Sequence, residues 1–220
     1  LKFNEFYLID DLYFETVNKT FLLGNFSIYI TPFFILLLLN SLNMADGING
    51  NSTVIILSYL LLLFNNNINL NLITLSIVPA LLIFFYFNLR NKIYLGDSGI
   101  YFLSLIISLY VINKYNTESI VISCEEIFLI FLIPGLDMFR LFIYRLFKKK
   151  NPFIGDKNHF HHLLINRFEL KYTLLIYFTL INWPIILHNI FKLNILILLL
   201  VNILLFFILI LYLQKLKKFS

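Results

Sequence analysis

Three short polar segments hold most of the side chains in this chain that could do chemistry. They run from Asn40 to Gly50, from Tyr94 to Gly99 and from Asn151 to His162. Each follows an apolar stretch, and together they supply carboxylates, carboxamides and imidazoles. Carboxylate oxygens bind Mg²⁺, and a protonated imidazole can donate hydrogen bonds to phosphate oxygens. Gathered at one place, these groups would hold a metal-bound diphosphate.

The first segment places Asn40, Asn43, Asp46 and Asn49 at intervals of three residues. In a helix, three-residue steps keep side chains along one slowly drifting face, so the spacing predicts a polar face at a helix end. The two glycines of this segment would let the backbone turn or let a ligand approach closely. The alternative is an ordinary polar helix terminus with a glycine cap.

The second segment places Asp97 and Ser98 immediately before the apolar stretch that begins at Gly99. Either residue could simply cap a helix by accepting hydrogen bonds from its free amides. A carboxylate can also give Mg²⁺ a hard oxygen ligand, and Mg²⁺ usually takes only one or two from a protein. Asp97 is therefore the preferred metal ligand.

The third segment gathers three of the four histidines, His159, His161 and His162, behind Asp156 and Lys157. A zinc site is the alternative, but no cysteine lies nearby and Asp156 is the only neighbouring carboxylate. A solvated loop is the other alternative. The concentration of imidazoles beside a lysine favours binding of phosphate oxygens, because histidine changes its charge near neutral pH.

The elements that carry these segments are apolar helices. The chain is 60% hydrophobic and 13% charged, with a mean hydropathy of +0.86. Soluble domains are about 45–50% apolar and about 25% charged. The apolar stretches are continuous rather than alternating, which excludes a barrel of transmembrane strands. The fold class is therefore an all-α polytopic membrane protein, and its single cysteine excludes an internal disulfide.

A membrane-spanning helix needs about 20 mostly apolar residues. Seven stretches are candidates: Ser27–Leu42, Thr53–Phe64, Leu70–Leu89, Gly99–Asn113, Cys124–Leu146, Tyr172–Asn189 and Asn194–Leu213. Residues 1–26 precede them and are predicted to form an extramembrane hairpin, because aromatic and β-branched residues are mixed with Asp, Thr and Asn before Gly24. No second domain is evident, so residues 1–220 form one integral-membrane domain with a histidine loop over 147–171.

Basic residues orient the bundle. With seven spans, the three polar segments share one face, and that face carries thirteen of the 17 lysines and arginines. The other four are Lys2, Lys19, Lys114 and Lys192. Basic residues accumulate on the cytoplasmic side of membrane proteins, so the polar segments are expected in the cytoplasm of a bacterial inner (plasma) membrane.

These segments, with Pro134 to Asp137 lying between the last two, resemble the motifs of the polyprenyl-phosphate N-acetylhexosamine-1-phosphate transferases, glycosyltransferase family 4. That pattern is Asn-Ala-x-Asn-x-x-Asp-Gly-x-Asp-Gly, then Phe-x-Gly-Asp-x-Gly-Ser, Pro-x-x-Asp and a histidine motif. All four occur here in order, across essentially the whole chain. The His-x-His-His spacing is similar to the UDP-GlcNAc:undecaprenyl-phosphate branch. The phospho-N-acetylmuramoyl-pentapeptide branch more often has three consecutive histidines.

The resemblance implies transfer of a HexNAc-1-phosphate, GlcNAc-1-phosphate first, from a UDP-sugar to a polyprenyl phosphate with release of UMP. Such a step begins lipid-linked glycan synthesis, as in the cell-wall, O-antigen or teichoic acid pathways. It also implies Mg²⁺, with Mn²⁺ as the alternative ion. Asp46 would orient the acceptor phosphate and Asn49 would contact the uracil. The expected catalytic residues are Asp46, Asp97, His159, His161 and His162. The expected substrate-binding residues are Asn40, Asn49 and Lys157, and the expected metal ligands are Asn43 and Asp97.

The chain departs from the family pattern in three places. Asn49 stands where the pattern has its second aspartate, and Ile100 replaces the final serine of the second motif. The paired aspartates that the family carries upstream are missing, and Asp10-Asp11 would lie on the opposite membrane face. We therefore expect an N-terminally truncated fragment, beginning at Leu1, that lacks several helices and is inactive alone.

Two other functions stay open. One is the muramoyl-pentapeptide transferase of the same superfamily. The other is a non-catalytic transporter whose polar segments line a cytoplasmic vestibule, although transporters usually carry ionisable groups within their spans. The expected partners are the UDP-sugar, the polyprenyl phosphate and the bilayer, with no nucleic acid. The sequence leaves a homodimer open, and also the choice between one-step and two-step transfer.

Overall fold

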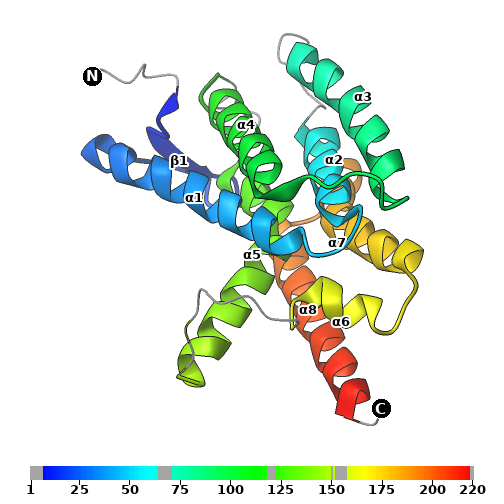
Figure 1. The fold of residues 1–220 in the computed structure, drawn as a ribbon. Helices are drawn as coiled ribbons and strands as arrows, with labels where there is room; N and C mark the ends of the chain where they lie inside the picture. The colour runs from blue at the N-terminus through cyan, green and yellow to red at the C-terminus, as the bar shows by residue number, and fades with distance from the viewer. Residues whose placement is uncertain (1–6, 64–70, 118–121, 150, 152–157, 219–220) are drawn as a thin grey trace.

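The computed structural model describes residues 7–63, 71–117, 122–149, 151 and 158–218. It is a bundle of helices with one small hairpin (Figure 1). In chain order, the elements are β1 (Asp11–Phe14), β2 (Lys19–Leu22), η2 (Gly24–Phe26), α1 (Ser27–Ala45), α2 (Asn51–Leu63), α3 (Asn71–Asn88), α4 (Gly96–Thr117), α5 (Cys124–Phe147), α6 (Phe160–Ile165), α7 (Leu170–Phe191) and α8 (Ile195–Lys218).

Five of the helices are long and apolar enough to cross a membrane. They cover Gly24–Ala45, Gly96–Asn116, Cys124–Phe147, Leu170–Phe191 and Ile195–Lys215. Two of the seven expected spans correspond to shorter apolar helices, Asn51–Leu63 and Thr74–Asn88. The prediction of an all-α polytopic membrane protein is confirmed, and the described residues hold five long apolar helices and two shorter ones where seven candidate spans were expected.

The N-terminal hairpin is also present. β1 and β2 pair antiparallel, with Asp11 opposite Leu22 and Phe14 opposite Lys19. Its turn docks on the start of α5, where the Glu125 carboxylate accepts hydrogen bonds from the amides of Glu15 (3.1 Å) and Thr16 (3.2 Å) and from the Thr16 hydroxyl (2.7 Å). Buried acceptors are satisfied in this way because an unpaired buried carboxylate would be costly.

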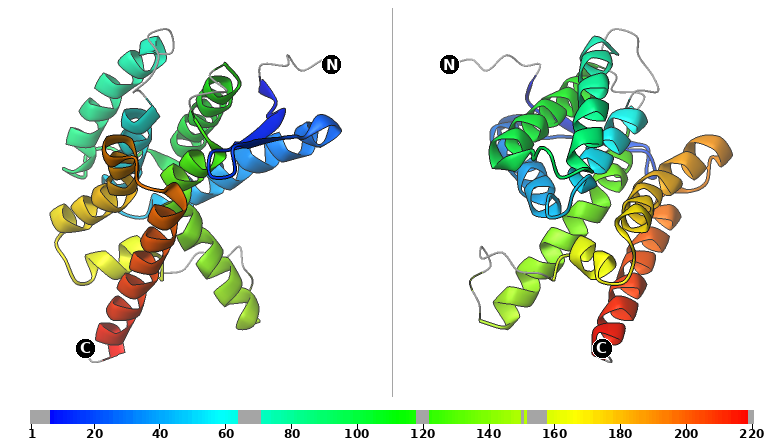
Figure 2. Two further views of the ribbon diagram at one scale, coloured as in Figure 1. Left: turned by 180° about the vertical axis from the view of Figure 1, so that it is seen from behind. Right: turned by 45° about the vertical axis from the view of Figure 1, so that its right-hand side comes forward.

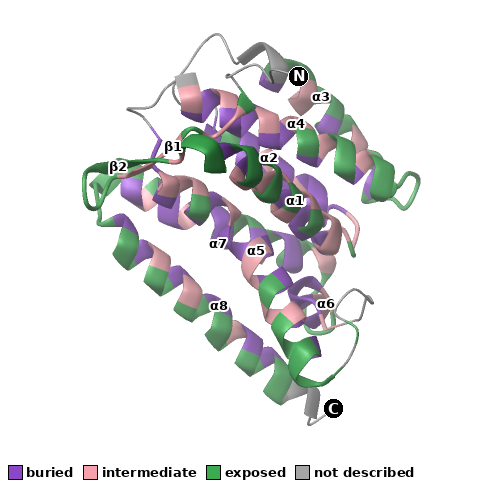
Figure 3. Cartoon of the chain, turned by 90° about the vertical axis from the view of Figure 1, so that its left-hand side faces the viewer, coloured by how far each residue is buried: buried purple, intermediate pink, exposed green. Residues whose placement is uncertain are grey.

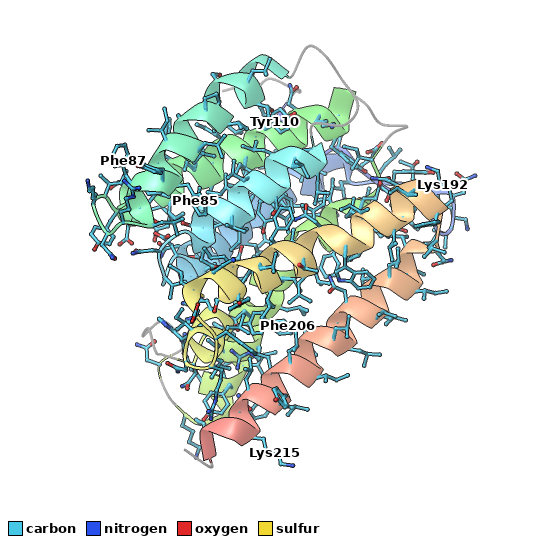
Figure 4. All side chains as sticks on the ribbon, turned by 90° about the vertical axis from the view of Figure 1, so that its right-hand side faces the viewer. Phe85, Phe87, Tyr110, Lys192, Phe206 and Lys215 are labelled. Carbon is cyan, nitrogen blue, oxygen red and sulfur yellow. The ribbon has the colours of Figure 1, made fainter. Side chains whose placement is uncertain are left out.

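The bundle has a buried centre and an apolar outer surface. α1 packs against α4 and α5, α2 packs against α7, and α7 also contacts α5 and α8. Figure 3 shows buried residues where α2, α5 and α7 meet, whereas α8 is exposed along one side. That side carries Leu200, Leu204 and Ile208, each about 60% exposed, as expected of a face turned to lipid. Lys192 ends α7 just before α8 begins, and Lys215 lies near the other end of α8 (Figure 4).

Two features of the fold position the third polar segment. The first is a short helix, α6, that lies beside α8 in the loop expected over 147–171 (Figure 2). It is anchored by Phe160, whose fully buried ring lies 5.2 Å from the ring of Tyr177 and 5.1 Å from that of Phe206. The second is α5, whose C-terminal half extends past the end of α1 (Figure 1). Asp137 lies near the middle of this helix.

Candidate functional site

The first polar segment begins as helix and ends as a turn. Asn40 and Asn43 lie on the last turns of α1, and Asp46 follows as the residue that ends the helix. Asn49 lies beyond it, in the turn before α2. The expected helical progression therefore applies only as far as Asp46. The position of Asn49 is set by the turn instead, and its side-chain amide donates a 2.5 Å hydrogen bond to Asn91 Oδ1.

The second polar segment forms the first turn of α4 and meets the end of α1. Asn43 Nδ2 donates a 3.3 Å hydrogen bond to the hydroxyl of Tyr101. Asp97 lies four residues before Tyr101, and residues four apart on a helix share a face. The exposed Asp97 carboxylate is thus on the side of α4 that faces the end of α1.

The pKa of Asp46 reflects how close this carboxylate lies to that of Asp97. Burial raises the pKa of Asp46 above its ordinary value, and the negative charge of Asp97 raises it further. A 2.5 Å hydrogen bond from the Ser52 hydroxyl opposes this shift in pKa. A cation bound between these two carboxylates would offset the repulsion between their negative charges.

The third polar segment is fixed by a carboxylate of α5. Asp137, 4% exposed, accepts hydrogen bonds from His159 Nδ1 and from the backbone amide of Phe160, both 3.0 Å long. Arg140 donates to the same carboxylate (2.6 Å) and to the carbonyl of Asn158 (2.7 Å). Because an ionised carboxylate only accepts, His159 carries its proton on Nδ1. The entry to α6 is thus tied to the middle of α5.

His161 brings the third segment onto the first. Its ring is 1% exposed and packs against Gly47, so a Cβ atom built on Gly47 would lie only 2.1 Å from His161 Nε2. Burial, with help from the neighbouring His162 and His159, lowers the pKa of His161 to about 3. His161 is therefore a neutral imidazole near pH 7, unlike the cationic clamp that a solvated histidine could provide.

Two residues that the sequence did not single out connect the first segment to the second. Asn88, at the end of α3, accepts a 2.6 Å hydrogen bond from the amide of Gly50 and donates one to the carbonyl of Ile93 (2.8 Å). Asn91 holds Asn49. The sequence did contain a clue to Asn88 and Asn91, because these two carboxamides interrupt an aromatic stretch just ahead of the second segment. Ser52 and Tyr101 carried no such signal.

The structure therefore brings most of the predicted site residues to one end of the bundle. Asp46, Asp97, Asn43 and the histidine helix α6 meet there, and Asn49 is tied to the loop that leads into α4. Asn40 is exposed on α1, with its amide bonded to the carbonyl of Leu36. Lys157 and Asp156 lie outside the described residues. The hairpin, with Asp10 and Asp11, docks at the other ends of α1, α4 and α5.

The donor groups at this end suit a hard cation better than zinc. Across the described ranges, no group of three or more His, Cys, Asp or Glu side chains is arranged to hold a metal ion. What is present is two carboxylates and the amide of Asn43. Mg²⁺ needs few protein ligands because water and phosphate oxygens complete its shell, whereas zinc sites take three or four. The residues present therefore fit Mg²⁺.

Known proteins of similar sequence indicate the family of the chain. The sequence family described as glycosyl transferase family 4 matches residues 6–114. The undecaprenyl-phosphate alpha-N-acetylglucosaminyl 1-phosphate transferase of Escherichia coli O157:H7 is 26% identical over 170 residues, 70% of this chain and 46% of that protein. The Salmonella typhi protein of the same name is 29% identical over 153 residues, 65% of this chain and 42% of that protein.

A second kind of relative also matches. The phospho-N-acetylmuramoyl-pentapeptide-transferase of Dictyoglomus thermophilum is 34% identical over 152 residues, 66% of this chain and 46% of that protein. The chain spans less than half the length of these relatives. No solved structure matches it. The family match, both kinds of relative and the four motifs in register show that the chain belongs to glycosyl transferase family 4, within the polyprenyl-phosphate hexosamine-1-phosphate transferase superfamily.

Proposed function

We propose that this chain forms the site of an enzyme that transfers GlcNAc-1-phosphate from UDP-GlcNAc to a polyprenyl phosphate and releases UMP. The observation that carries the proposal is the contact between Gly47 and His161, which brings the Asp46 segment and the histidine helix together. With the bond between Asn43 and Tyr101, carboxylates, amides and imidazoles from three separate segments converge at one end of the bundle. Such a set of donors and acceptors suits a metal-bound diphosphate.

The reaction needs charge neutralisation more than proton removal. The second pKa of a phosphomonoester is about 6, so the acceptor phosphate is largely dianionic at pH 7. Its oxygen attacks the phosphorus that bears the sugar, and the bond from that phosphorus to the bridging oxygen of UMP breaks. When bound, Mg²⁺ would neutralise charge on the diphosphate and on the leaving UMP.

The proposed roles follow from where each residue lies. Asp97 and Asn43 would hold Mg²⁺, as hard oxygen donors beside the substrate. Asp46, held by Ser52, would orient the acceptor phosphate. The side-chain oxygen of Asn49 is left for the uracil imide, because its amide nitrogen is already bonded to Asn91. The histidine helix and Lys157 would bind the sugar diphosphate, and His162 is the least buried of its three imidazoles.

An apolar cavity supports a lipid acceptor. It encloses about 290 Å³ between α1, α4 and α5, and nearly all its lining side chains are apolar. It extends from Leu12 and Cys124 near the hairpin to Ser41 and Met138 near the site. A polyprenyl chain lying there would bury isoprenoid surface and leave its phosphate beside Asp46.

The proposal is tested with the complete reading frame that contains these residues, in lipid nanodiscs with polyprenyl phosphate and Mg²⁺. UMP release should be fastest with UDP-GlcNAc among a panel of UDP-sugars. The second candidate is pentapeptide transfer, favoured by the 34% identity to the Dictyoglomus protein, and it predicts turnover of UDP-MurNAc-pentapeptide alone. No UMP release from any donor would overturn both.

A further inference from the structure

Position 47 needs a glycine because there is no space for a side chain, not because of its backbone conformation. The described glycines with positive φ are Gly24, Gly50 and Gly96. Gly47 is not among them, so alanine could adopt its backbone conformation without strain. A side chain there would instead strike the ring of His161, at 2.1 Å from Nε2 and 2.9 Å from Cε1. By contrast, a Cβ atom on Gly135 would meet nothing within 4 Å. The space at Gly47 is filled by His161.

The ring of His161 cannot easily move aside. One face stacks on His159, with ring centres 5.5 Å apart and planes 7° from parallel, and His159 is itself bonded to Asp137. The ring of His162 lies 4.2 Å away. Neither ring nitrogen of His161 has a hydrogen-bond partner among the described residues. Burying an imidazole without hydrogen-bond partners is unfavourable, so something other than hydrogen bonding must account for a histidine at position 161.

We propose that His161 and Gly47 form a steric interlock that sets how closely the histidine helix approaches the Asp46 segment. His161 is then a positioning residue that acts through the backbone at Gly47, and His162 remains to bind the donor. The chain of contacts runs from Asp137 through His159 and His161 to Gly47, next to Asp46. The middle of α5 thereby fixes the relative placement of two substrate-binding segments. This inference rests on the proposed function for its kinetic consequence.

The interlock predicts that one substitution corrects another. Gly47→Ala should lower kcat about tenfold or more with KM for the UDP-sugar little changed, because misplacing catalytic groups by an ångström or so is costly. Gly47→Ala with His161→Ala should recover most of that loss, since the added methyl group fits the space left by the imidazole. His161→Ala alone should be milder than Gly47→Ala. Asn166→Ala, an exposed change at the end of the same helix, is the matched control.

Thermal unfolding of the same proteins gives a readout that does not need activity. Gly47→Ala should lower the unfolding temperature and the double variant should raise it again, even if Gly47→Ala alone accumulates poorly. A double variant no better than Gly47→Ala, in both rate and unfolding temperature, would overturn the interlock. If the unaltered protein releases no UMP, the proposed function fails, but the unfolding temperatures still decide the interlock.

Discussion

Asp46 and Asp97 are two of the carboxylates at the site, and their surroundings differ. Asp46 is half-buried and bonded to Ser52, whereas Asp97 is exposed at the start of α4. Asp97 is open to solvent and can exchange water for a metal ion, which a buried acid with a raised pKa does less readily. For this reason we propose Asp97, rather than Asp46, as the carboxylate that binds Mg²⁺.

Asp97→Asn should remove most UMP release while the protein still inserts in the membrane. The change keeps the shape of the side chain and removes the charge that would bind Mg²⁺, which contributes several kcal/mol to lowering the barrier. Activity is measured across a Mg²⁺ titration, with Ser98→Ala as the neighbouring control. Near-normal turnover at saturating Mg²⁺ would assign Asp97 a structural role in the first turn of α4.

His161 should make the protein less stable in acid. In the unfolded chain its pKa is near 6.5, but in the fold burial lowers it to about 3. Between these values only the unfolded state takes up the proton, so the free energy of unfolding falls by up to about 1.4 kcal/mol for each pH unit below 6.5. His161→Gln should show a shallower loss of stability from pH 6.5 to 4, measured by denaturant unfolding in detergent. An unchanged slope would contradict the neutral buried imidazole.

At the scale of elements, α6 depends on a single carboxylate of α5. Asp137→Ala would leave the mostly buried Arg140 without its carboxylate partner, with only the carbonyl of Asn158 as acceptor, and the amide of Phe160 without its acceptor. Breaking one side of a buried ion pair typically costs about 3–5 kcal/mol. We expect the free energy of unfolding to fall by about that amount and UMP release to be lost with it. Glu169→Gln, an exposed change just before α7, should alter neither, and a loss below about 1 kcal/mol in Asp137→Ala would contradict the anchor.

The hairpin depends in the same way on Glu125. Glu125→Ala removes the acceptor for three hydrogen bonds from the turn, so the hairpin should detach locally and trypsin should cleave faster after Lys19. Thr16→Val removes only the hydroxyl bond and should give a smaller increase. Equal cleavage rates for all three proteins would show that other contacts hold the hairpin, among them the bond from the Tyr13 amide to the Tyr115 hydroxyl.

The elements differ in how far the sequence could predict them. The long apolar runs were enough to predict α1, α4, α5, α7 and α8, and the mixture of aromatic and polar residues at the N-terminus was enough to predict the hairpin. Six residues are too few for helical periodicity to show, and α6 depends on Phe160 docking against Tyr177 and Phe206 from distant segments. The bond from Asn88 to Gly50 and the packing of His161 on Gly47 are likewise long-range contacts, which no local pattern encodes.

At the scale of the whole molecule, the site and the hairpin lie at opposite ends of the bundle. Thr31, near the start of α1, accepts a hydrogen bond from the amide of Ile9, and Asp46 caps the other end of α1 at the site. α4 has 22 residues, about 33 Å of helix, close to the thickness of a hydrocarbon core. Its first turn carries Asp97 and its last turns contact the hairpin through Tyr115 and Asn116. One end must therefore face each side of the membrane.

Labelling of single cysteines should show which end of the bundle faces the cytoplasm. In a Cys124→Ser background, Val17→Cys places a thiol on the exposed hairpin turn and Ser98→Cys places one beside Asp97. Thirteen of the 17 basic residues are expected on the site face, so the positive-inside rule puts Asp97 in the cytoplasm. A membrane-impermeant maleimide applied to spheroplasts should label the Val17→Cys protein at once, and the Ser98→Cys protein only after permeabilisation. The reverse pattern would place the site outside the cell, away from cytoplasmic UDP-sugars, and would contradict the proposed function as well as the orientation.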